Sequence, residues 1–215
     1  QEHGYICRVQ PRVLMKSLFD FIVRPINKRY DNEVKIGDKS LITNTNTEDF
    51  KAVSNRAVVV STPSAYSTLI KEGDVVIIHH NVFRSFFDIR GKRKDSRSKF
   101  VDDLYFCSPD QIYLYNNGDD WKSFRDRCFV KPLLDNNDLT LDKERKLIGI
   151  LKYGNSSLEA VKIVPGDLIG YTPYGEFEFI IDGERLYCMK SNDIVIKYEY
   201  KGDEEEYNPS WANSS

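Results

Sequence analysis

The sequence contains few of the residues that build metal and redox sites. It has three histidines and four cysteines in 215 residues, and no two cysteines form a Cys-x-x-Cys pair. His79 and His80 are adjacent, so on a strand they would point to opposite faces. We therefore expect no metal and no other cofactor. The scattered cysteines indicate buried, reduced thiols and a reducing, cytoplasmic location.

Long apolar runs and catalytic signatures are also missing. No run approaches the roughly 18–20 apolar residues that cross a bilayer, and the first residues lack the layout of a secretion signal. The sequence has no Gly-x-Ser-x-Gly, no P-loop and no His-Glu-x-x-His. Asp74 and Asp167 each follow a glycine and are predicted to be turn residues. The expectation is a protein that is neither an enzyme nor membrane-bound, with no catalytic residues.

Excess charge of either sign is absent over the whole chain, whose formal net charge is −2. One local exception is "RGKRKDSRSK" (Arg90–Lys99), with six Lys or Arg and one Asp. A phosphate or nucleic-acid contact is one interpretation of this stretch. A solvated insertion is the other, and no nucleic-acid motif surrounds it. We therefore expect no nucleic-acid partner. The aromatic stretch before it, Asn81–Asp88, fits a core strand or a subunit contact.

What the sequence does contain is a repeat. Three pairs of segments occur in the same order in both halves: Phe21–Pro25 with Cys128–Pro132, Lys71–Ile78 with Val164–Tyr171, and Leu104–Tyr115 with Leu186–Tyr198. They read "FIVRP" and "CFVKP", "KEGDVVII" and "VPGDLIGY", "LYFCSPDQIYLY" and "LYCMKSNDIVIKY". One match could be chance, but an ordered set indicates two copies of one module.

Within both copies, short β-rich runs alternate with turn signals. Arg56–Thr62 is strongly β-branched, and Asp182-Gly183 is a typical hairpin turn. Many short strands and no long helical period predict an all-β protein. The predicted organisation is an N-terminal extension (1–16), module 1 (17–118), module 2 (119–200) and an acidic tail (201–215).

The ordered set of segments resembles the GroES-type co-chaperonins, the ten-kilodalton chaperonin family. The second copy carries the clearer match, through "VKIVPGDLIGYTPYGEFEFIIDGERLY" (Val161–Tyr187) and "ERLYCMKSNDIVIKY" (Glu184–Tyr198). The resemblance covers roughly 17–115 and 126–200. It implies two tandem, irregular GroES-like β-barrels. Tandem members of similar length exist in chloroplasts. Divergent members occur in large tailed phages, and the divergence of this chain is compatible with such a source.

In that family each subunit reaches the chaperonin through one loop after the first strand. The loop carries an apolar tripeptide among Gly, Ser and Thr. The matching segment here is "VKIGDKSLITNTNTEDFKAVSN" (Val34–Asn55). The resemblance assigns partner binding to its residues Gly37, Ser40, Leu41, Ile42 and Thr43. A short core strand is the alternative interpretation of the same residues. In the second copy, Leu133–Gly149 is shorter and lacks a preceding glycine, although Leu139 and Leu141 could serve.

The resemblance thus implies a co-chaperonin that caps or modulates a GroEL-type chaperonin and assists protein folding. The partner would bind the ATP, and this chain would form a homo-oligomeric ring. A rival interpretation is a GroES-like barrel that serves as a structural part of a virus particle or other large complex, since a fold does not fix a function.

Overall fold

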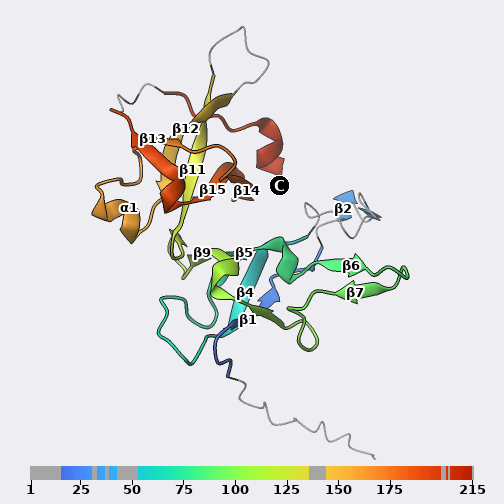
Figure 1. The fold of residues 1–215 in the computed structure, drawn as a ribbon. Helices are drawn as coiled ribbons and strands as arrows, with labels where there is room; N and C mark the ends of the chain where they lie inside the picture. Colours follow the sequence, from blue (N-terminus) through green and yellow to red (C-terminus); the bar gives the residue numbers. More distant parts are fainter. Residues whose placement is uncertain are drawn as a thin grey trace, which may run out of the picture.

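The structure, a computed structural model, describes residues 16–30, 33–36, 39–42, 53–135, 144–199, 202 and 204–214. Only the backbone is described at 33–36, 39–42 and 213–214. This part of the chain is all-β, as predicted, with one α-helix, α1 (Ser156–Ala160). Five residues are far too few for that helix to cross a bilayer. Two six-stranded antiparallel sheets dominate the fold (Figure 1).

The first sheet has the order β10-β9-β5-β4-β1-β8. Its strands are β1 (Phe21–Pro25), β4 (Arg56–Ser61), β5 (Val75–Ile78), β8 (Tyr105–Cys107), β9 (Ile112–Asn116) and β10 (Trp121–Ser123). In β4 buried residues alternate with half-buried ones. That period of two is what a pleated strand imposes on a β-branched run.

The second sheet has the order β14-β15-β11-β12-β13-β16. Its strands are β11 (Arg127–Leu134), β12 (Glu144–Tyr153), β13 (Leu168–Tyr171), β14 (Phe177–Ile181), β15 (Glu184–Lys190) and β16 (Ile194–Lys197). Short strands joined by turns, as predicted for both copies, make up this sheet as well. In each sheet the described end strands do not pair with one another. Neither sheet therefore closes, and the two barrels stay a prediction.

The two sheets repeat one connectivity. The run β9-β5-β4-β1-β8 corresponds strand by strand to β16-β13-β12-β11-β15. β1 and β11 each shift register against the next strand in the same place, after Ile22 and after Phe129. The equivalent 3-10 turns are η3 (Pro109–Gln111) and η4 (Ser191–Asp193). This match supports the repeat inferred from the sequence. The predicted boundary at 118/119 remains untested, and β10 pairs with the first sheet.

The Gly-Asp pairs close the same turn in both copies. Gly73 has φ +93° and Gly166 has φ +96°, a region that suits glycine. Asp74 accepts the Lys71 N–H through Oδ2 at 2.8 Å, and Asp167 accepts the Val164 N–H through Oδ2 at 2.8 Å. The prediction that both aspartates are turn residues is therefore confirmed.

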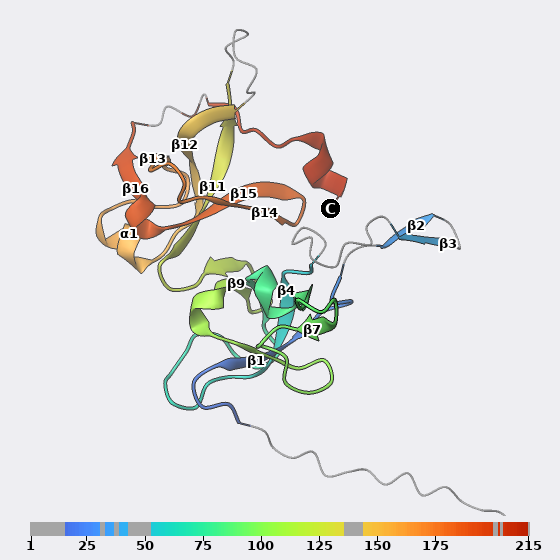
Figure 2. The same cartoon turned by 45° about the vertical axis from the view of Figure 1, so that its right-hand side comes forward.

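Smaller elements lie outside the large sheets. One hairpin consists of β2 (Glu33–Ile36) and β3 (Lys39–Ile42), and another of β6 (Ser85–Phe87) and β7 (Arg93–Asp95). Figure 2 shows β2–β3 well away from both sheets. The remaining short turns are η2 (His80–Val82) and η5 (Ser210–Ser214). Both hairpins are insertions in the first copy, after β1 and after β5.

Each sheet buries apolar side chains on both faces. Alternate residues such as Val76 and Ile78 fill a core inside the first copy. Cys128 and Val130 do the same in the second copy. The residue between each pair faces the other way, into a third core that both copies share. This division follows from the alternation of side chains along a strand.

Candidate functional site

The residues predicted to bind a partner lie on the β2–β3 hairpin. Ser40, Leu41 and Ile42 belong to β3, where Leu41 pairs with Val34. The structure thus places this segment in a hairpin rather than in either six-stranded sheet. Gly37 and Thr43 lie outside the described residues. Side chains of the hairpin are not described, so partner binding by Leu41 and Ile42 stays a prediction.

The second copy has its own connection at the equivalent place, between β11 and β12. Leu139 and Leu141 lie within it, outside the described residues. The described part of β12 begins at Glu144, whose Oε2 accepts hydrogen bonds from Arg185 Nη1 at 2.6 Å and from the Tyr187 hydroxyl at 3.1 Å. A second docking loop therefore remains untested.

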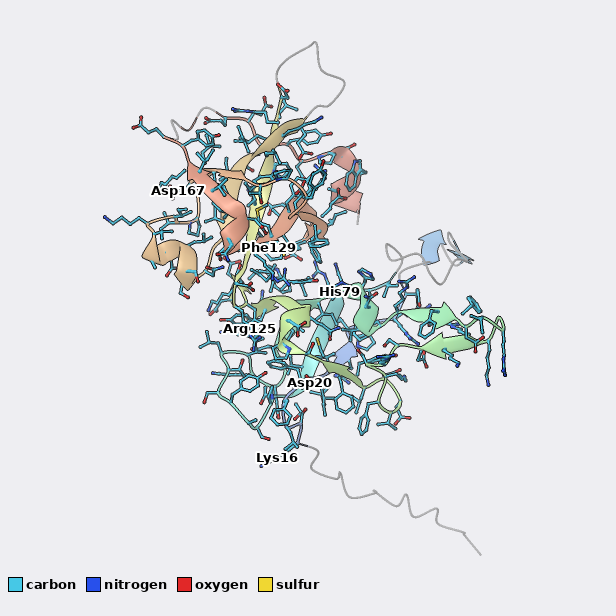
Figure 3. The ribbon with its side chains drawn as sticks, viewed as in Figure 1. Lys16, Asp20, His79, Arg125, Phe129 and Asp167 are labelled. Atoms are coloured by element: carbon cyan, nitrogen blue, oxygen red, sulfur yellow. The ribbon has the colours of Figure 1, made fainter. Side chains whose placement is uncertain are left out.

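A shared apolar core joins the two copies. The first copy contributes Ile77, Tyr113, Leu114 and Trp121, and the second contributes Phe129, Ile181, Leu186 and Cys188. The Tyr113 and Phe179 rings meet edge-to-face, with centroids 5.2 Å apart. Figure 3 shows Phe129 on the side of its sheet that faces the first copy. Burial of this kind is the main favourable term in packing two units together.

Polar contacts border the shared core. Asp182, on the β14–β15 turn, binds Arg56 of β4 through an ion pair of 2.8 Å. It also accepts a hydrogen bond of 2.7 Å from the Trp121 indole N–H. These two donors hold the pKa of Asp182 below its ordinary value, because they outweigh the opposing effect of burial. The Arg56–Asp182 ion pair and the Trp121–Asp182 hydrogen bond fix how one copy is positioned against the other.

The two copies use different surfaces for this contact. In the first copy it comes from β5, β9 and β10, and in the second from β11, β14 and β15. These strands are not equivalent in the repeat. The copies are therefore packed head-to-tail, which is a heterologous contact. In such a contact each copy uses one of two complementary surfaces, so the other surface of each copy is left unused.

The unused half of the first copy is apolar and open to solvent. Ile22 pairs with Phe106 in the first copy, and Phe129 pairs with Cys188 in the second. The two pairs are equivalent in the repeat. Ile22 and Phe106 are therefore the first-copy counterparts of two residues that the second copy contributes to the shared core. A surface hollow is lined by Ile22 and Phe106 with Leu18, Phe19 and Phe100. Leu18 is 63% exposed and Phe19 is 68% exposed. Ile22 lies at the base of this hollow and is itself only 1% exposed. We name Leu18, Phe19, Phe100 and Phe106 the head surface.

The unused half of the second copy lies on β16. Ile196 pairs with Gly170 as Leu114 pairs with Ile77, so Ile196 corresponds to Leu114 of the shared core. Its neighbour Val195 corresponds to Tyr113. Val195 is 58% exposed and Ile196 is 45% exposed. We name Val195 and Ile196 the tail surface. The head and tail surfaces are thus the two halves of a contact that the chain already makes once internally.

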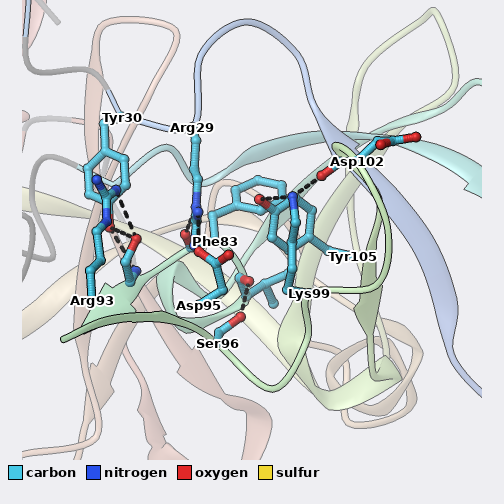
Figure 4. Close-up of polar contacts among 11 residues, drawn as sticks. Arg29, Tyr30, Phe83, Arg93, Asp95, Ser96, Lys99, Asp102 and Tyr105 are labelled. Carbon is cyan, nitrogen blue, oxygen red and sulfur yellow. Dashed lines mark hydrogen bonds and ion pairs between the residues drawn. The ribbon is translucent and has the colours of Figure 1, made fainter. Parts of the chain in front are cut away.

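The basic stretch forms much of the β6–β7 hairpin, which Arg29 fastens to the first copy (Figure 4). Arg29 donates to the Phe83 carbonyl and forms an ion pair of 2.5 Å with Asp95. Tyr30 accepts the Ser85 N–H at 2.8 Å. The solvated insertion is therefore a folded ribbon with a fixed base.

The histidines and cysteines form no reactive centre in the described residues. Burial, then the neighbouring His79 and Arg84, lowers the pKa of His80 to about 4. No group of three potential ligands gathers there to hold a metal. Cys107, Cys128 and Cys188 are buried free thiols, and burial raises the pKa of Cys128 to about 12. Such thiols are poor nucleophiles and poor metal ligands.

Comparison with known proteins returns no match, either to a protein-family model or to a curated protein. The features of the chain that bear on its function are therefore its geometry and its repeat.

Sequence reasoning missed both the shared core and the head and tail surfaces. The repeat itself was the available signal, because aligned copies expose positions where one copy is buried and the other is not. Trp121 could not be placed in this way, since the second sheet has no described counterpart of β10.

Proposed function

We propose that this chain is a non-enzymatic, GroES-like co-chaperonin that assembles head-to-tail and docks on a GroEL-type chaperonin through the β2–β3 hairpin. The observation that carries the proposal is the head-to-tail packing of the two copies. A contact of this type continues from chain to chain and closes into a ring or extends as a filament.

Assembly would use the two exposed surfaces. The tail surface of one chain would cover the head surface of the next, as the first copy covers the second within the chain. Exposed apolar patches of this kind mark interaction sites. Ala57 pairs with Pro25, and Gly149 pairs with the equivalent Pro132. Arg56, one residue before Ala57, therefore corresponds to Ile148 in the second copy. The contact between chains would therefore lack the Arg56–Asp182 ion pair and depend more on apolar burial.

Docking would use Leu41 and Ile42. The hairpin leaves each chain outside the six-stranded sheets, so a ring would present several copies of it on one partner. A weak site per chain then gains affinity through multivalency and still permits release. In this proposal the partner binds ATP, each module is a GroES-like barrel, and the protein works in the cytoplasm.

The assembly is tested by sedimentation velocity. We expect the wild-type chain to be oligomeric, and Val195→Glu/Ile196→Glu to be monomeric. Ile89→Glu is the control, because Ile89 is fully exposed on the β6–β7 hairpin and belongs to neither surface. The control variant should assemble like the wild type. A monomeric wild type, or a tail variant that assembles normally, would overturn the head-to-tail proposal.

A mixing experiment tests the polarity of the contact. Leu18→Glu/Phe19→Glu blocks the head surface and leaves the tail surface intact. Mixed with the tail variant, it should form a dimer and nothing larger, since only one productive pair of surfaces remains. In an isologous contact, mixing the two variants would not restore a dimer. A mixture that fails to dimerise would therefore count against the head-to-tail polarity.

Docking is tested separately by co-sedimentation with a GroEL-type chaperonin in the presence of ATP. Binding should be lost in Leu41→Asp/Ile42→Asp and kept in Leu139→Asp/Leu141→Asp, which alters the connection of the second copy. An assembled chain that binds no chaperonin would leave the rival function, a structural part of a large complex. The same head and tail surfaces favour that rival equally.

A further inference from the structure

A surface cavity of about 350 Å³ lies beside the β6–β7 hairpin and combines several hydrogen-bond donors with an aromatic ring. Its lining includes Arg84, Arg97, Asn81, Gln111, Ser98 and Phe86, and no carboxylate. A cavity with two guanidinium groups and no acidic residue favours an anionic ligand.

Within the described part of the chain, the Arg84 guanidinium has one atom without a hydrogen-bond partner. Its Nε is buried and makes no hydrogen bond. A guanidinium keeps its charge in a protein and has no acceptor of its own. Buried polar groups are nearly always paired, so an exception needs an explanation. A phosphate oxygen in the cavity would supply the missing acceptor.

Gln111 adds an oriented donor. Its Oε1 accepts hydrogen bonds from the Ser108 N–H at 3.0 Å and from the Ser108 hydroxyl at 3.1 Å. The carbonyl end of the amide is therefore occupied, which leaves its NH₂ group for a ligand. Neutral amides and guanidinium forks together are common partners of nucleic-acid phosphates.

The hairpin extends the positive charge beyond one phosphate. Its two acids are already committed, since Asp95 pairs with Arg29 at 2.5 Å and Asp88 with Lys94 at 3.3 Å. Arg90, Lys92 and Arg97 have no ion pair with the described residues. Figure 3 shows the hairpin reaching away from the rest of the chain with its side chains exposed. A ligand with several phosphates matches this row of cations better than a single anion does.

An aromatic ring lies among these cations. Phe86 lines the cavity and is 40% exposed. It pairs with Lys94 across the hairpin, so the two side chains share one face. Aromatic rings that alternate with basic side chains are typical of surfaces that bind single-stranded nucleic acid, where bases stack on the rings.

We propose that this cavity holds a backbone phosphate of single-stranded nucleic acid, with Arg84 and Arg97 on the phosphate and Phe86 under a neighbouring base. The site shares no residue with the head, tail and docking surfaces, although it borders the head surface where the Phe106 N–H donates to the Ser98 carbonyl at 2.7 Å. It differs from the expectation of no nucleic-acid partner. That expectation depended on the lack of a known motif around Arg90–Lys99, which does not report the cavity that the folded hairpin forms.

Fluorescence anisotropy with a labelled 20-nucleotide oligo-dT tests the site in the full chain. Arg84→Met/Arg97→Met should weaken binding by about tenfold or more, because two phosphate contacts are lost. The control Lys71→Met/Lys122→Met removes the same charge from exposed residues elsewhere and should change the affinity by less than about threefold. Binding should fall as salt is raised. An undetectable affinity, or equal losses in the two double variants, would overturn the proposal.

Two further variants keep the test clear of folding defects and identify the ligand. Arg97→Met alone alters an exposed side chain and should still weaken binding measurably. Phe86→Ala should weaken oligo-dT binding and leave competition by inorganic phosphate unchanged. Duplex DNA that binds as tightly as oligo-dT, with no effect of Phe86→Ala, would overturn the single-stranded assignment. Inorganic phosphate that displaces labelled oligo-dT as strongly as unlabelled oligo-dT does would also overturn the single-stranded assignment.

Discussion

At the scale of single residues, the Gly-Asp turns show how closely the copies match. Asp167 accepts a hydrogen bond from the Val164 N–H and forms an ion pair of 2.6 Å with Lys197. Asp74 makes the same turn hydrogen bond in the first copy. Burial would raise the pKa of Asp167, but the hydrogen bonds from Lys197 and Val164 outweigh it and lower that pKa.

We predict that Asp167→Ala lowers the free energy of unfolding by about 1–2 kcal/mol, because a charged acceptor of a backbone N–H is lost. Since the folded state depresses this pKa, its contribution is fully present above about pH 4, the ordinary value, and is lost as pH falls below it. Urea unfolding at pH 7 and at pH 3 checks this. A difference between wild type and variant that does not shrink at pH 3 would contradict it. Asp74→Ala is the comparison in the first copy.

At the scale of elements, the two inserted hairpins are a structural difference between the copies. The sheet strands repeat, whereas β2–β3 and β6–β7 occur in the first copy alone among the described residues. The sequence indicated both segments as unusual, through Leu-Ile in a polar stretch and through a run of basic residues. It predicted neither as a hairpin, because their strands are short and their apolar residues do not alternate clearly.

Arg29 is predicted to hold the β6–β7 hairpin in place. In Arg29→Met the hydrogen bond to the Phe83 carbonyl and the ion pair with Asp95 are both lost. Hydrogen exchange at residues 85–95 should become faster, because local opening costs less, while exchange in β4 and β5 should be unchanged. Mass spectrometry of the exchanged protein measures this. Arg90→Met, which removes an exposed cation from the hairpin, should leave exchange as in the wild type.

At the scale of the whole molecule, the shared core makes the copies one packing unit. Phe129 is fully buried and belongs to the core that residues of both copies form. We predict that Phe129→Ala lowers the free energy of unfolding by about 3–5 kcal/mol, the usual cost of a large cavity. The measurements are made in a Trp211→Phe background, so that the fluorescence comes from Trp121. Circular dichroism and this fluorescence should then report one shared unfolding transition. Two transitions, only one of them shifted, would mean that the copies unfold independently.

The sequence by itself determined the strands, the repeat and the turns. These depend on local preferences: β-branched runs, glycines at positive φ, and aspartates that accept nearby N–H groups. Asp74, Asp167 and the strands of the second copy were therefore predictable. The apolar tripeptide at Ser40–Ile42 was also visible, and its binding to a partner is a prediction that local sequence does not decide.

Only the tertiary structure decided how the copies pack. Phe129 and Ile22 are equivalent in the repeat, and both carry apolar side chains, so no local pattern says which one joins the shared core. That choice follows from which surface of the first copy meets the second, and it makes Val195 and Ile196 exposed while Tyr113 and Leu114 are buried. The cavity at Arg84 is also decided by the folded chain, which brings its lining together from three separate stretches within residues 81–111.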